Sequence, residues 1–332
     1  MKKVLLIVAT VLVVLFLVVM LGPDQSFDSI NPDIETLDIP LEEIEEYVAA
    51  AERKVQGIKE DNHSRIIWAD SVRKTDYAIV YLHGFSASPM ESYPLHMDLA
   101  KRYGCNIYLP RLSQHGLSDE EAFLQLTPVS LMASAKEAVA IGNLLGEKVI
   151  LMSCSTGGTL SIYLAAHNPE LIEAQILYSP NIQIYDPTVK IVNDPWGAVI
   201  LKQIVGDYRS FPDETEAVQQ YWNTRYRSEG IIALQELLEQ AMTTEVFEQV
   251  NQPYFLGYYY KNEEEQDKTV SVEAMQAYHK VTGTPEDQKV SVAFPDVASH
   301  VIASEFQSKD IESVREASQT FMENILGLQA AL

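Results

Sequence analysis

Cysteines and metal-ligand patterns are scarce in this sequence. Its 332 residues include two cysteines, Cys105 and Cys154, and no cysteine–histidine spacing typical of a zinc site. The H-E-x-x-H metalloprotease motif and the G-x-x-x-x-G-K-[ST] phosphate-binding loop are both missing. The sequence therefore predicts neither a metal centre nor a nucleotide-binding P-loop.

Basic residues are also few. The chain has 24 basic residues against 47 acidic ones, which gives a net charge of −23. Phosphate backbones would repel such a chain, so we do not expect nucleic acid as a partner. Anionic lipid headgroups would repel it as well, so attachment to a membrane would need an apolar segment. Otherwise the charge is typical of a solvated, soluble surface.

One apolar segment lies at the N-terminus. Residues 4–21, "VLLIVATVLVVLFLVVML", follow "MKK" and carry no charge. As a helix they would measure roughly 27 Å, close to the hydrocarbon thickness of a bilayer. A cleaved signal peptide has a shorter apolar core, about 7–15 residues, and a small-residue cleavage site that is missing here. We expect residues 1–22 to be a transmembrane anchor, with a cleaved signal as the alternative.

The charges beside this segment predict its orientation. Lys2 and Lys3 precede it, whereas Asp24, Asp28 and Asp33 follow it. The positive-inside rule then keeps the N-terminus in the cytoplasm. The expected location is the membrane, with the rest of the chain outside the cytoplasm, or export after signal cleavage.

Strand-like and helix-like segments alternate through most of the chain. A spacer and a helix over residues 23–60 come first, and short β-rich runs then alternate with apolar stretches at helical spacing. The strands are expected to begin at Arg65, Ala78, Asn106, Lys148, Ala174, Pro253 and Lys289, and the helices at Ser92, Pro128, Gly157, Ser271 and about Ser308. This order predicts an α/β fold with a mostly parallel central sheet flanked by helices.

The alternation stops between residues 183 and 250, where strand signals are weak. Residues 217–242, "AVQQYWNTRYRSEGIIALQELLEQAM", indicate helix with a break at Gly230. We therefore expect a core of residues 61–182 and 251–332, and a helical cap over residues 183–250. The aromatic residues of this cap that are candidates to line an apolar pocket are Trp196, Phe211, Tyr221 and Trp222.

The stretch "VILMSCSTGGTL", residues 149–160, joins an expected strand to an expected helix. A serine on such a tight turn has a strained backbone and an exposed side chain, and the residues two before and two after it must be small. The residues two before Ser153 and Cys154 are bulky, whereas Ser155 is flanked by Ser153 and Gly157. We expect Ser155 to be a nucleophile, with Ser153 in place of the first glycine of G-x-S-x-G. Without catalytic partners, the turn would be only a loop.

Three motifs in this order resemble the α/β-hydrolase superfamily. "YLHGFSAS" (residues 81–88) is similar to the family's strand and H-G-F oxyanion loop, and "YLPRLSQHGLS" (108–118) is similar to its next strand and H-G loop. "SCSTGG" (153–158) is similar to the nucleophile elbow. The order matches from residue 65 to about residue 305, and the resemblance is nearest to carboxylesterases and monoacylglycerol-lipase-like enzymes. It implies an α/β-hydrolase fold.

The family's chain order is nucleophile, acid and then histidine, which implies the partners of Ser155. His300 follows the last expected strand, in the loop where the family carries its base. The acid is expected after the strand "PYFLGYYY". There, "D-K-T-V-S" resembles the family's D-x-x-V segment and marks Asp267.

Other acids and histidines have different expected roles. Glu264 and Glu265, in the acidic run before "D-K-T-V-S", are the next candidates for the acid. Asp296 lies on the wrong loop, too near the base in sequence. His83 and His115 precede glycines in family loops, and we expect them to be structural.

The resemblance also implies the oxyanion hole and the reaction. Its two backbone N–H groups would come from Thr156, after the nucleophile, and from Phe85. In the expected serine hydrolase, Ser155 attacks a carboxylic ester and forms an acyl-enzyme. His300 takes the proton, Asp267 orients His300, and no metal or organic cofactor is needed. The alternatives are a peptidase or carbon–carbon bond hydrolase on the same scaffold, or a non-catalytic binding protein.

Cys105 and Cys154 are expected to be free thiols. In the family's strand order their strands are separated by the strand "AIVYL", and they lie at opposite ends of those strands. A disulfide tolerates Cα separations of only about 4.4–6.8 Å.

Overall fold

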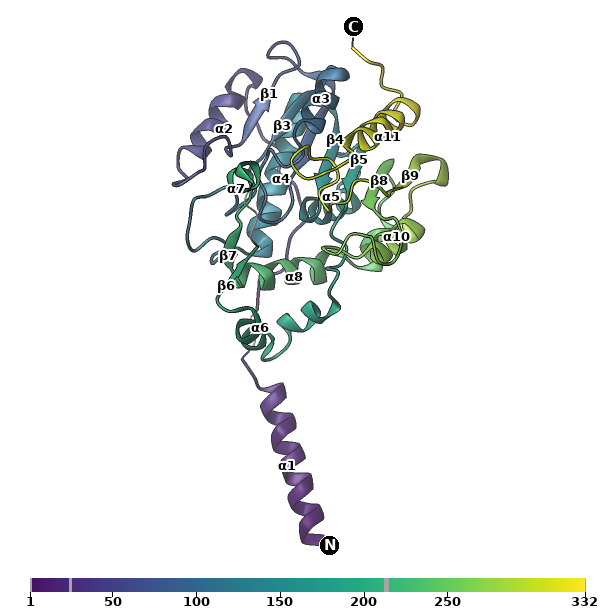
Figure 1. The fold of residues 1–332 in the computed structure, drawn as a ribbon. Coiled ribbons are helices and arrows are strands. Elements are labelled where there is room, and N and C mark those ends of the chain that lie inside the picture. Colours follow the sequence, from purple (N-terminus) through teal and green to yellow (C-terminus); the bar gives the residue numbers. More distant parts are fainter. Residues whose placement is uncertain (1, 24–25, 212–214, 332) are drawn as a thin grey trace.

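Seven strands form the central sheet of the computed structural model, which describes residues 2–23, 26–211 and 215–331. Their order is β1-β3-β2-β4-β5-β8-β9 (Figure 1). β1 is antiparallel to β3, and the other neighbouring pairs are parallel. The bounds are β1 Arg65–Ile67, β2 Thr75–Leu82, β3 Asn106–Leu109, β4 Gly146–Cys154, β5 Ala174–Tyr178, β8 Tyr254–Tyr259 and β9 Lys289–Phe294. The expected mostly parallel α/β sheet is confirmed.

Helices cover both faces of the sheet, which explains why its strands are continuously apolar. Successive side chains of β2 alternate between two buried clusters: Val80 and Leu82 belong to one, Ile79 and Tyr81 to the other. The helices that contribute to the first cluster include α4 Pro128–Leu145, α5 Thr156–His167 and α10 Val272–Val281. Those that contribute to the second include α3 Leu95–Arg102 and α11 Ile311–Asn324.

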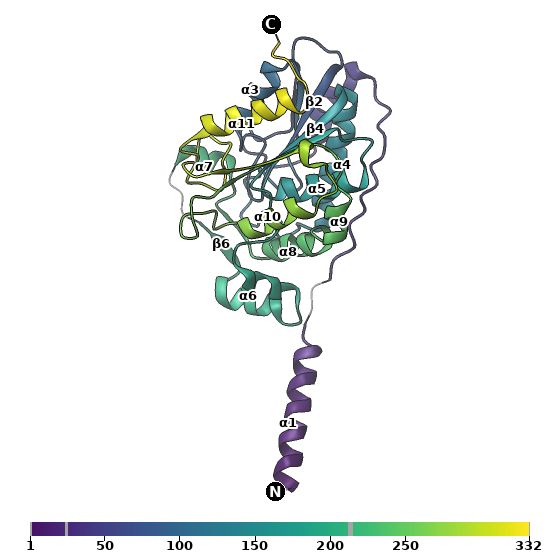
Figure 2. The ribbon, with the colours of Figure 1, turned by 90° about the vertical axis from the view of Figure 1, so that its right-hand side faces the viewer.

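The segment over residues 183–250, called the insertion below, is partly different from the expected cap. Its helices are η2 Pro187–Asn193, α6 Gly197–Val205, α7 Glu216–Tyr221, α8 Glu229–Ala241 and α9 Thr244–Glu248. α8 and α9 lie beside α10, at the end of the core nearest α6 (Figure 2). β6 Tyr208–Ser210 and β7 Arg225–Arg227 form an antiparallel pair between these helices (Figure 1).

The helix expected over residues 217–242, with a break at Gly230, was therefore wrong in part: the helical segment is interrupted before Gly230, not at it. α7 ends at Tyr221 and α8 begins at Glu229, so β7 separates them, and Gly230 lies in the first turn of α8. Strands as short as β6 and β7 leave too few residues for a period-2 pattern. Their pairing is supported by Arg225, whose guanidinium lies 3.6 Å from the centroid of the Tyr208 ring.

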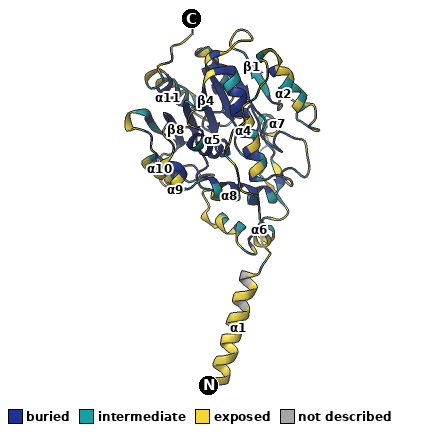
Figure 3. Cartoon of the chain, turned by 180° about the vertical axis from the view of Figure 1, so that it is seen from behind, coloured by how far each residue is buried: buried dark blue, intermediate teal, exposed yellow. Residues whose placement is uncertain are grey.

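The N-terminal residues form helix α1, Lys2–Met20, which projects from the molecule beside α6 (Figures 1 and 2). The side chains of α1 that are described are exposed (Figure 3). Among residues 2–23, 26–211 and 215–331, no helix has the length and apolarity needed to cross a membrane. The transmembrane segment expected over residues 1–22 is thus not supported. Met1 and Asp24 lie outside the described residues.

The expected spacer is packed against the core. Its part over residues 26–40, called the strap below, runs from the end of the molecule near α6 to helix α2, Ile44–Glu52 (Figure 2). Ile30 of the strap is buried, and its N–H donates to Gln240 Oε1 at 2.8 Å. Asn168 Nδ2 donates to the carbonyl of Pro32 at 3.0 Å. The strap therefore connects α8 and α5 to the opposite end of the core.

Both cysteines are buried and free, as expected. Cys105 directly precedes β3, and Cys154 ends β4. β2 lies between these two strands in the sheet. The sheet topology therefore keeps the two thiols apart.

Candidate active site

Ser155 lies at the turn between β4 and α5. β4 ends at Cys154 and α5 begins at Thr156, so Ser155 is the single residue between them. Its backbone has φ 51° and ψ −116°, a conformation that costs a non-glycine residue about 1–3 kcal/mol. The Ser155 N–H donates to Tyr178 O at 3.1 Å, and the Ser155 carbonyl accepts from Gly158 N at 2.8 Å. These two bonds hold the strained turn in place.

The residues two before and two after Ser155 are tightly surrounded. A Cβ on Gly157 would lie 1.9 Å from Leu82 O, so a larger residue cannot fit there. Ser153 is fully buried, and its Oγ donates to Ile176 O at 3.5 Å. The hydroxymethyl group that replaces the usual glycine is therefore accommodated against β5.

Asp267 and His300 meet although 33 positions separate them in the chain. His300 Nδ1 donates to Asp267 Oδ2 at 2.6 Å. Asp267 Oδ1 accepts from the N–H groups of Thr269 at 2.8 Å and Val270 at 3.2 Å. Because the carboxylate is fixed on both oxygens, it orients the imidazole and leaves Nε2 for proton transfer.

The pKa of His300 reflects opposing influences. Burial of the ring favours the neutral form and lowers the pKa. The nearby charge and hydrogen bond of Asp267, together with the charge of Glu91, outweigh burial and raise the pKa above the ordinary histidine value. The site is therefore arranged to stabilise an imidazolium.

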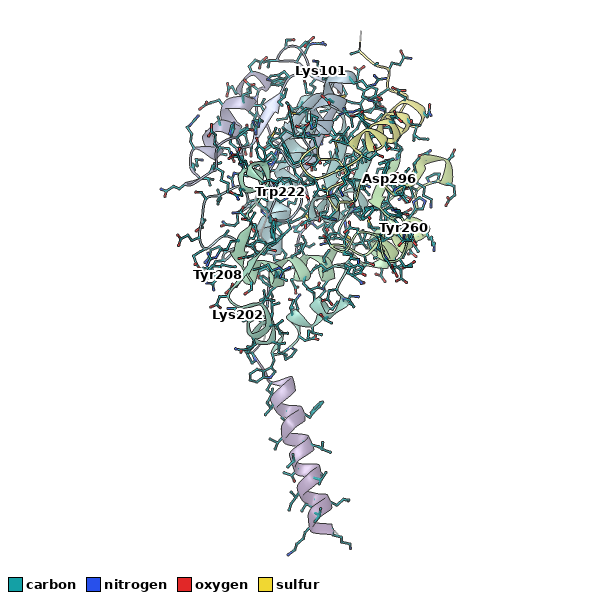
Figure 4. All side chains as sticks on the ribbon, in the orientation of Figure 1. Lys101, Lys202, Tyr208, Trp222, Tyr260 and Asp296 are labelled. Carbon is teal, nitrogen blue, oxygen red and sulfur yellow. The ribbon has the colours of Figure 1, made fainter. Side chains whose placement is uncertain are left out.

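The alternative acids lie apart from His300. Glu265 pairs with Lys261 at 3.1 Å, and Glu264 is exposed. Asp296 is exposed beside β9, near the edge of the molecule (Figure 4). Of the candidate acids, Asp267 is the one that the structure brings to the histidine.

The two histidines expected to be structural hold the loops after β2 and β3. His83 Nδ1 donates to Gly84 O at 2.9 Å, and its Nε2 accepts from Leu112 N at 3.0 Å. His115 Nδ1 lies 2.7 Å from Ser113 O. Burial lowers the pKa of His83 well below its ordinary value and that of His115 to about 4. Both rings are therefore neutral near pH 7 and bonded within the loops.

Phe85 and Thr156, the expected oxyanion donors, both border the cavity that Ser155 lines. Thr156 is the first residue of α5, so its N–H lies at a helix N-terminus. The Phe85 ring packs against Phe123 and against Tyr226 of β7, with centroid distances of 4.8 and 5.3 Å. The insertion thus directly contacts the loop that carries Phe85.

A cavity of about 580 Å³ extends from Ser155 and His300 beneath the insertion. Much of its wall is apolar and comes from the insertion: Ile184, Val189, Leu201, Val205, Phe211, Trp222, Tyr226, Ile231 and Leu234. Phe211 and Trp222 therefore line it as expected, and Figure 4 marks Trp222 near the middle of the molecule. Trp196 instead donates to Val18 O at 2.8 Å, and Tyr221 stacks on Phe306 at 5.4 Å.

Within the described part of the chain, no three histidine, cysteine or acidic side chains are grouped to hold a metal ion. The polar side chains that border the cavity besides the expected triad include Ser86, Glu91, Asn181, Asp186, Arg209 and Lys268.

A family model described as the alpha/beta hydrolase family matches residues 79–305. The chain belongs to the alpha/beta hydrolase family. A thermostable monoacylglycerol lipase from Bacillus sp. (strain H-257) is 32% identical to this family member over 93 residues. The match covers 28% of this chain and 36% of that protein, so the chain spans about a third of the relative's length.

Solved structures of other proteins have the same fold as this alpha/beta hydrolase. A chain described with the metagenome-derived lipolytic enzymes LipS and LipT has a TM-score of 0.64 at 16% identity, covering 80% of this chain and 99% of that one. A monoacylglycerol lipase of Paleococcus ferrophilus has a TM-score of 0.57 at 15% identity, with coverages of 79% and 98%. Est1E from Butyrivibrio proteoclasticus, bound to ferulic acid, has a TM-score of 0.54 at 16% identity, covering 82% of this chain and 100% of that one.

Sequence reasoning missed Glu91. Its side chain is buried and borders the same cavity as Ser155. No motif marks this residue, and a lone glutamate in a loop is expected to be exposed. Only the folded loop after β2 brings its carboxyl group to the site.

Proposed function

We propose that this protein is a serine esterase that cleaves small carboxylic esters. The observation that carries the proposal is the Asp267–His300 pair at the wall of an apolar cavity that Ser155 also lines. The monoacylglycerol lipase relative and the lipase and esterase folds support the same class of reaction.

In the proposed mechanism, Ser155 Oγ attacks the ester carbonyl while His300 Nε2 accepts its proton. Asp267 stabilises the imidazolium that forms. The N–H groups of Phe85 and Thr156 would bind the oxyanion of the tetrahedral intermediate. His300 then protonates the leaving alcohol. In the second half of the reaction water attacks the acyl-enzyme while His300 accepts its proton, and His300 returns that proton to Ser155 as the acid is released.

The structure supports a substrate with a short or medium acyl chain. The cavity holds about 580 Å³ under the insertion, and its apolar wall suits hydrocarbon. A peptidase or a carbon–carbon bond hydrolase would use the same nucleophile, so a substrate panel must include amides and β-diketones beside esters.

The first prediction concerns Ser155. Ser155→Ala should lose about 10⁴-fold or more of the kcat on a chromogenic acetyl or butyryl ester, since triad residues act as a unit. It should also lose labelling by a fluorophosphonate probe, with an unchanged circular dichroism spectrum. Ser153→Gly is the matched control and should stay active. Retained activity in Ser155→Ala, or wild-type protein that cleaves none of the panel, would overturn the proposed function.

A further inference from the structure

Glu91 is a buried carboxyl group to which the proposed mechanism assigns no step. Glu91 lies in the chain between β2 and α3. It is 2% exposed, and it borders the cavity beside Ser155 and His300. No lysine or arginine among the described residues forms an ion pair with it. A buried carboxylate without a cation is costly, so its hydrogen bonds must stabilise it.

The donors to Glu91 come from the strand and loop that carry the oxyanion site. Gly84 N–H donates to Glu91 Oε2 at 2.8 Å, and Tyr81 O–H donates to the same oxygen at 2.7 Å. Gly84 directly precedes Phe85, so the bond to its N–H fixes the backbone on one side of the proposed oxyanion donor. The carboxyl group thus ties the oxyanion loop to β2.

Gly84 also separates Glu91 from the nucleophile. A Cβ at Gly84 would lie 2.8 Å from Glu91 Oε1 and 3.1 Å from Ser155 Cβ. There is therefore no room for a side chain at Gly84 between the carboxyl group and the serine. Movement of the Glu91 side chain would shift the loop directly beside Ser155.

The charge of Glu91 acts on the base. Asp267, from the loop after β8, and Glu91, from the loop after β2, are the two charges that raise the pKa of His300 against the effect of burial. Burial raises the pKa of Glu91 itself; Tyr81, Gly84, the charge of His300 and the thiol of Cys154 at the end of β4 oppose that change but do not cancel it. The other charged side chains on the cavity wall are Asp186, Arg209 and Lys268.

We propose that Glu91 is a positioning residue, which holds the Gly84–Phe85 backbone for oxyanion binding and places a second negative charge near His300. It exchanges no proton with the substrate. The inference rests on the proposed function, because it assigns Glu91 a part in the same ester hydrolysis.

The test compares Glu91→Gln and Glu91→Leu with the wild-type full chain on a chromogenic butyryl ester, over a range of pH. Glu91→Leu removes the acceptor for Gly84 N–H, so kcat should fall by roughly 10- to 100-fold, less than the loss of a whole oxyanion donor, about 10²–10³-fold. KM should change little, because the bond matters most when negative charge develops. Glu263→Gln, in an exposed loop, is the matched control and should behave as wild type.

Glu91→Gln separates the charge from the hydrogen bond. An amide oxygen can still accept from Gly84 N–H, so kcat should fall less than in Glu91→Leu. Without the charge, the His300 base becomes neutral at lower pH, and the acid limb of kcat/KM should move to lower pH. A merely structural role would leave that limb in place.

The inference is overturned if Glu91→Leu keeps the wild-type kcat or if the acid limb of Glu91→Gln stays at its wild-type pH. If Glu91→Leu fails to fold by circular dichroism, the pH profile of Glu91→Gln alone decides. These outcomes are distinct from failure of the proposed function, in which wild type and Ser155→Ala would be equally active or equally inactive.

Discussion

At the scale of single residues, Ser155 shows how the backbone can specify a reactive side chain. Its positive φ is maintained by bonds to Tyr178 and Gly158, and the close approach of Gly157 to Leu82 leaves the turn no room to relax. The strain is therefore supported by the sheet and by the start of α5 together. A substitution that fills this space would move Ser155, the proposed nucleophile, without touching it.

The second prediction concerns Asp267. Asp267→Asn should lower kcat by roughly 10³–10⁴-fold, because an amide cannot hold His300 in the required tautomer or stabilise the imidazolium. The fold should persist, since the side-chain oxygen can still accept from Thr269 N and Val270 N. Steady-state kinetics should show Glu264→Gln, the matched control, near wild type. A large loss of activity in Glu264→Gln, with normal activity in Asp267→Asn, would mean that Glu264 and not Asp267 is the catalytic acid.

The third prediction is a pH dependence that follows from the raised pKa of His300. The base acts only when neutral, so kcat/KM should rise with pH and level off above that pKa. Because Asp267 and Glu91 raise the pKa of His300, the midpoint should lie above the ordinary histidine value of about 6.5. A pH–rate profile measures it. A midpoint below that value would mean that burial of the ring dominates.

At the scale of elements, the insertion supplies both the wall of the cavity and a contact with the oxyanion loop. A Cβ on Gly230 of α8 would lie 2.7 Å from Phe123 Cβ and 3.1 Å from Phe85 Cζ. α8 therefore packs directly on the ring of Phe85, the residue after Gly84. Changes in the insertion can be transmitted through this contact to Phe85, one of the two proposed oxyanion donors.

The fourth prediction uses the two faces of α6. Leu201 lines the cavity, whereas Val199 on the same helix is 40% exposed. Leu201→Trp should reduce kcat/KM for octanoyl esters more than for acetyl esters, since the larger ring takes up space for the acyl chain. Val199→Trp, the matched control, should leave the ratio unchanged.

A chain-length series of esters, with protein that lacks residues 1–22, measures this ratio. Wild type should cleave short and medium acyl esters much faster than long-chain triacylglycerols. Highest kcat/KM on an emulsified long-chain triacylglycerol would contradict the enclosed cavity and indicate an open or mobile insertion.

At the scale of the whole molecule, the strap joins parts that lie far apart. Buried Ile30 lies beside α8, and the bond from Asn168 to Pro32 lies at the end of α5. Partly buried Ile34 and Leu37 continue the packing towards α2. The strap is therefore part of the folded core. The described side chains of α1, in contrast, are exposed.

The fifth prediction follows from this difference. Removal of residues 1–22 should leave Tm unchanged, whereas removal of residues 1–40 should lower Tm by several degrees. Burial of one isoleucine side chain contributes about 1.5–3 kcal/mol, and further apolar residues of the strap would be lost as well. Differential scanning calorimetry distinguishes the two truncations, and equal Tm values would show that the strap adds no stability.

The sequence was sufficient for features that are local or ordered along the chain. The small residues around Ser155 predict its turn, and the resemblance to the α/β-hydrolase family marks Asp267 and His300. It was insufficient for Glu91, whose burial depends on how the loop after β2 folds back on Gly84. It also missed β6 and β7, because three-residue strands carry no periodic signal and are stabilised by contacts such as Arg225 on Tyr208. The placement of the domain outside the cytoplasm stays a prediction.

The two ends of the chain leave the molecule on opposite sides, α1 beside α6 and the C-terminal segment beyond α11 (Figure 1). This arrangement matters for a protein coupled to a solid support. Attachment through the C-terminus presents α6 and the insertion, whose residues line part of the cavity wall, to the liquid. Attachment through the N-terminus turns the same elements towards the resin.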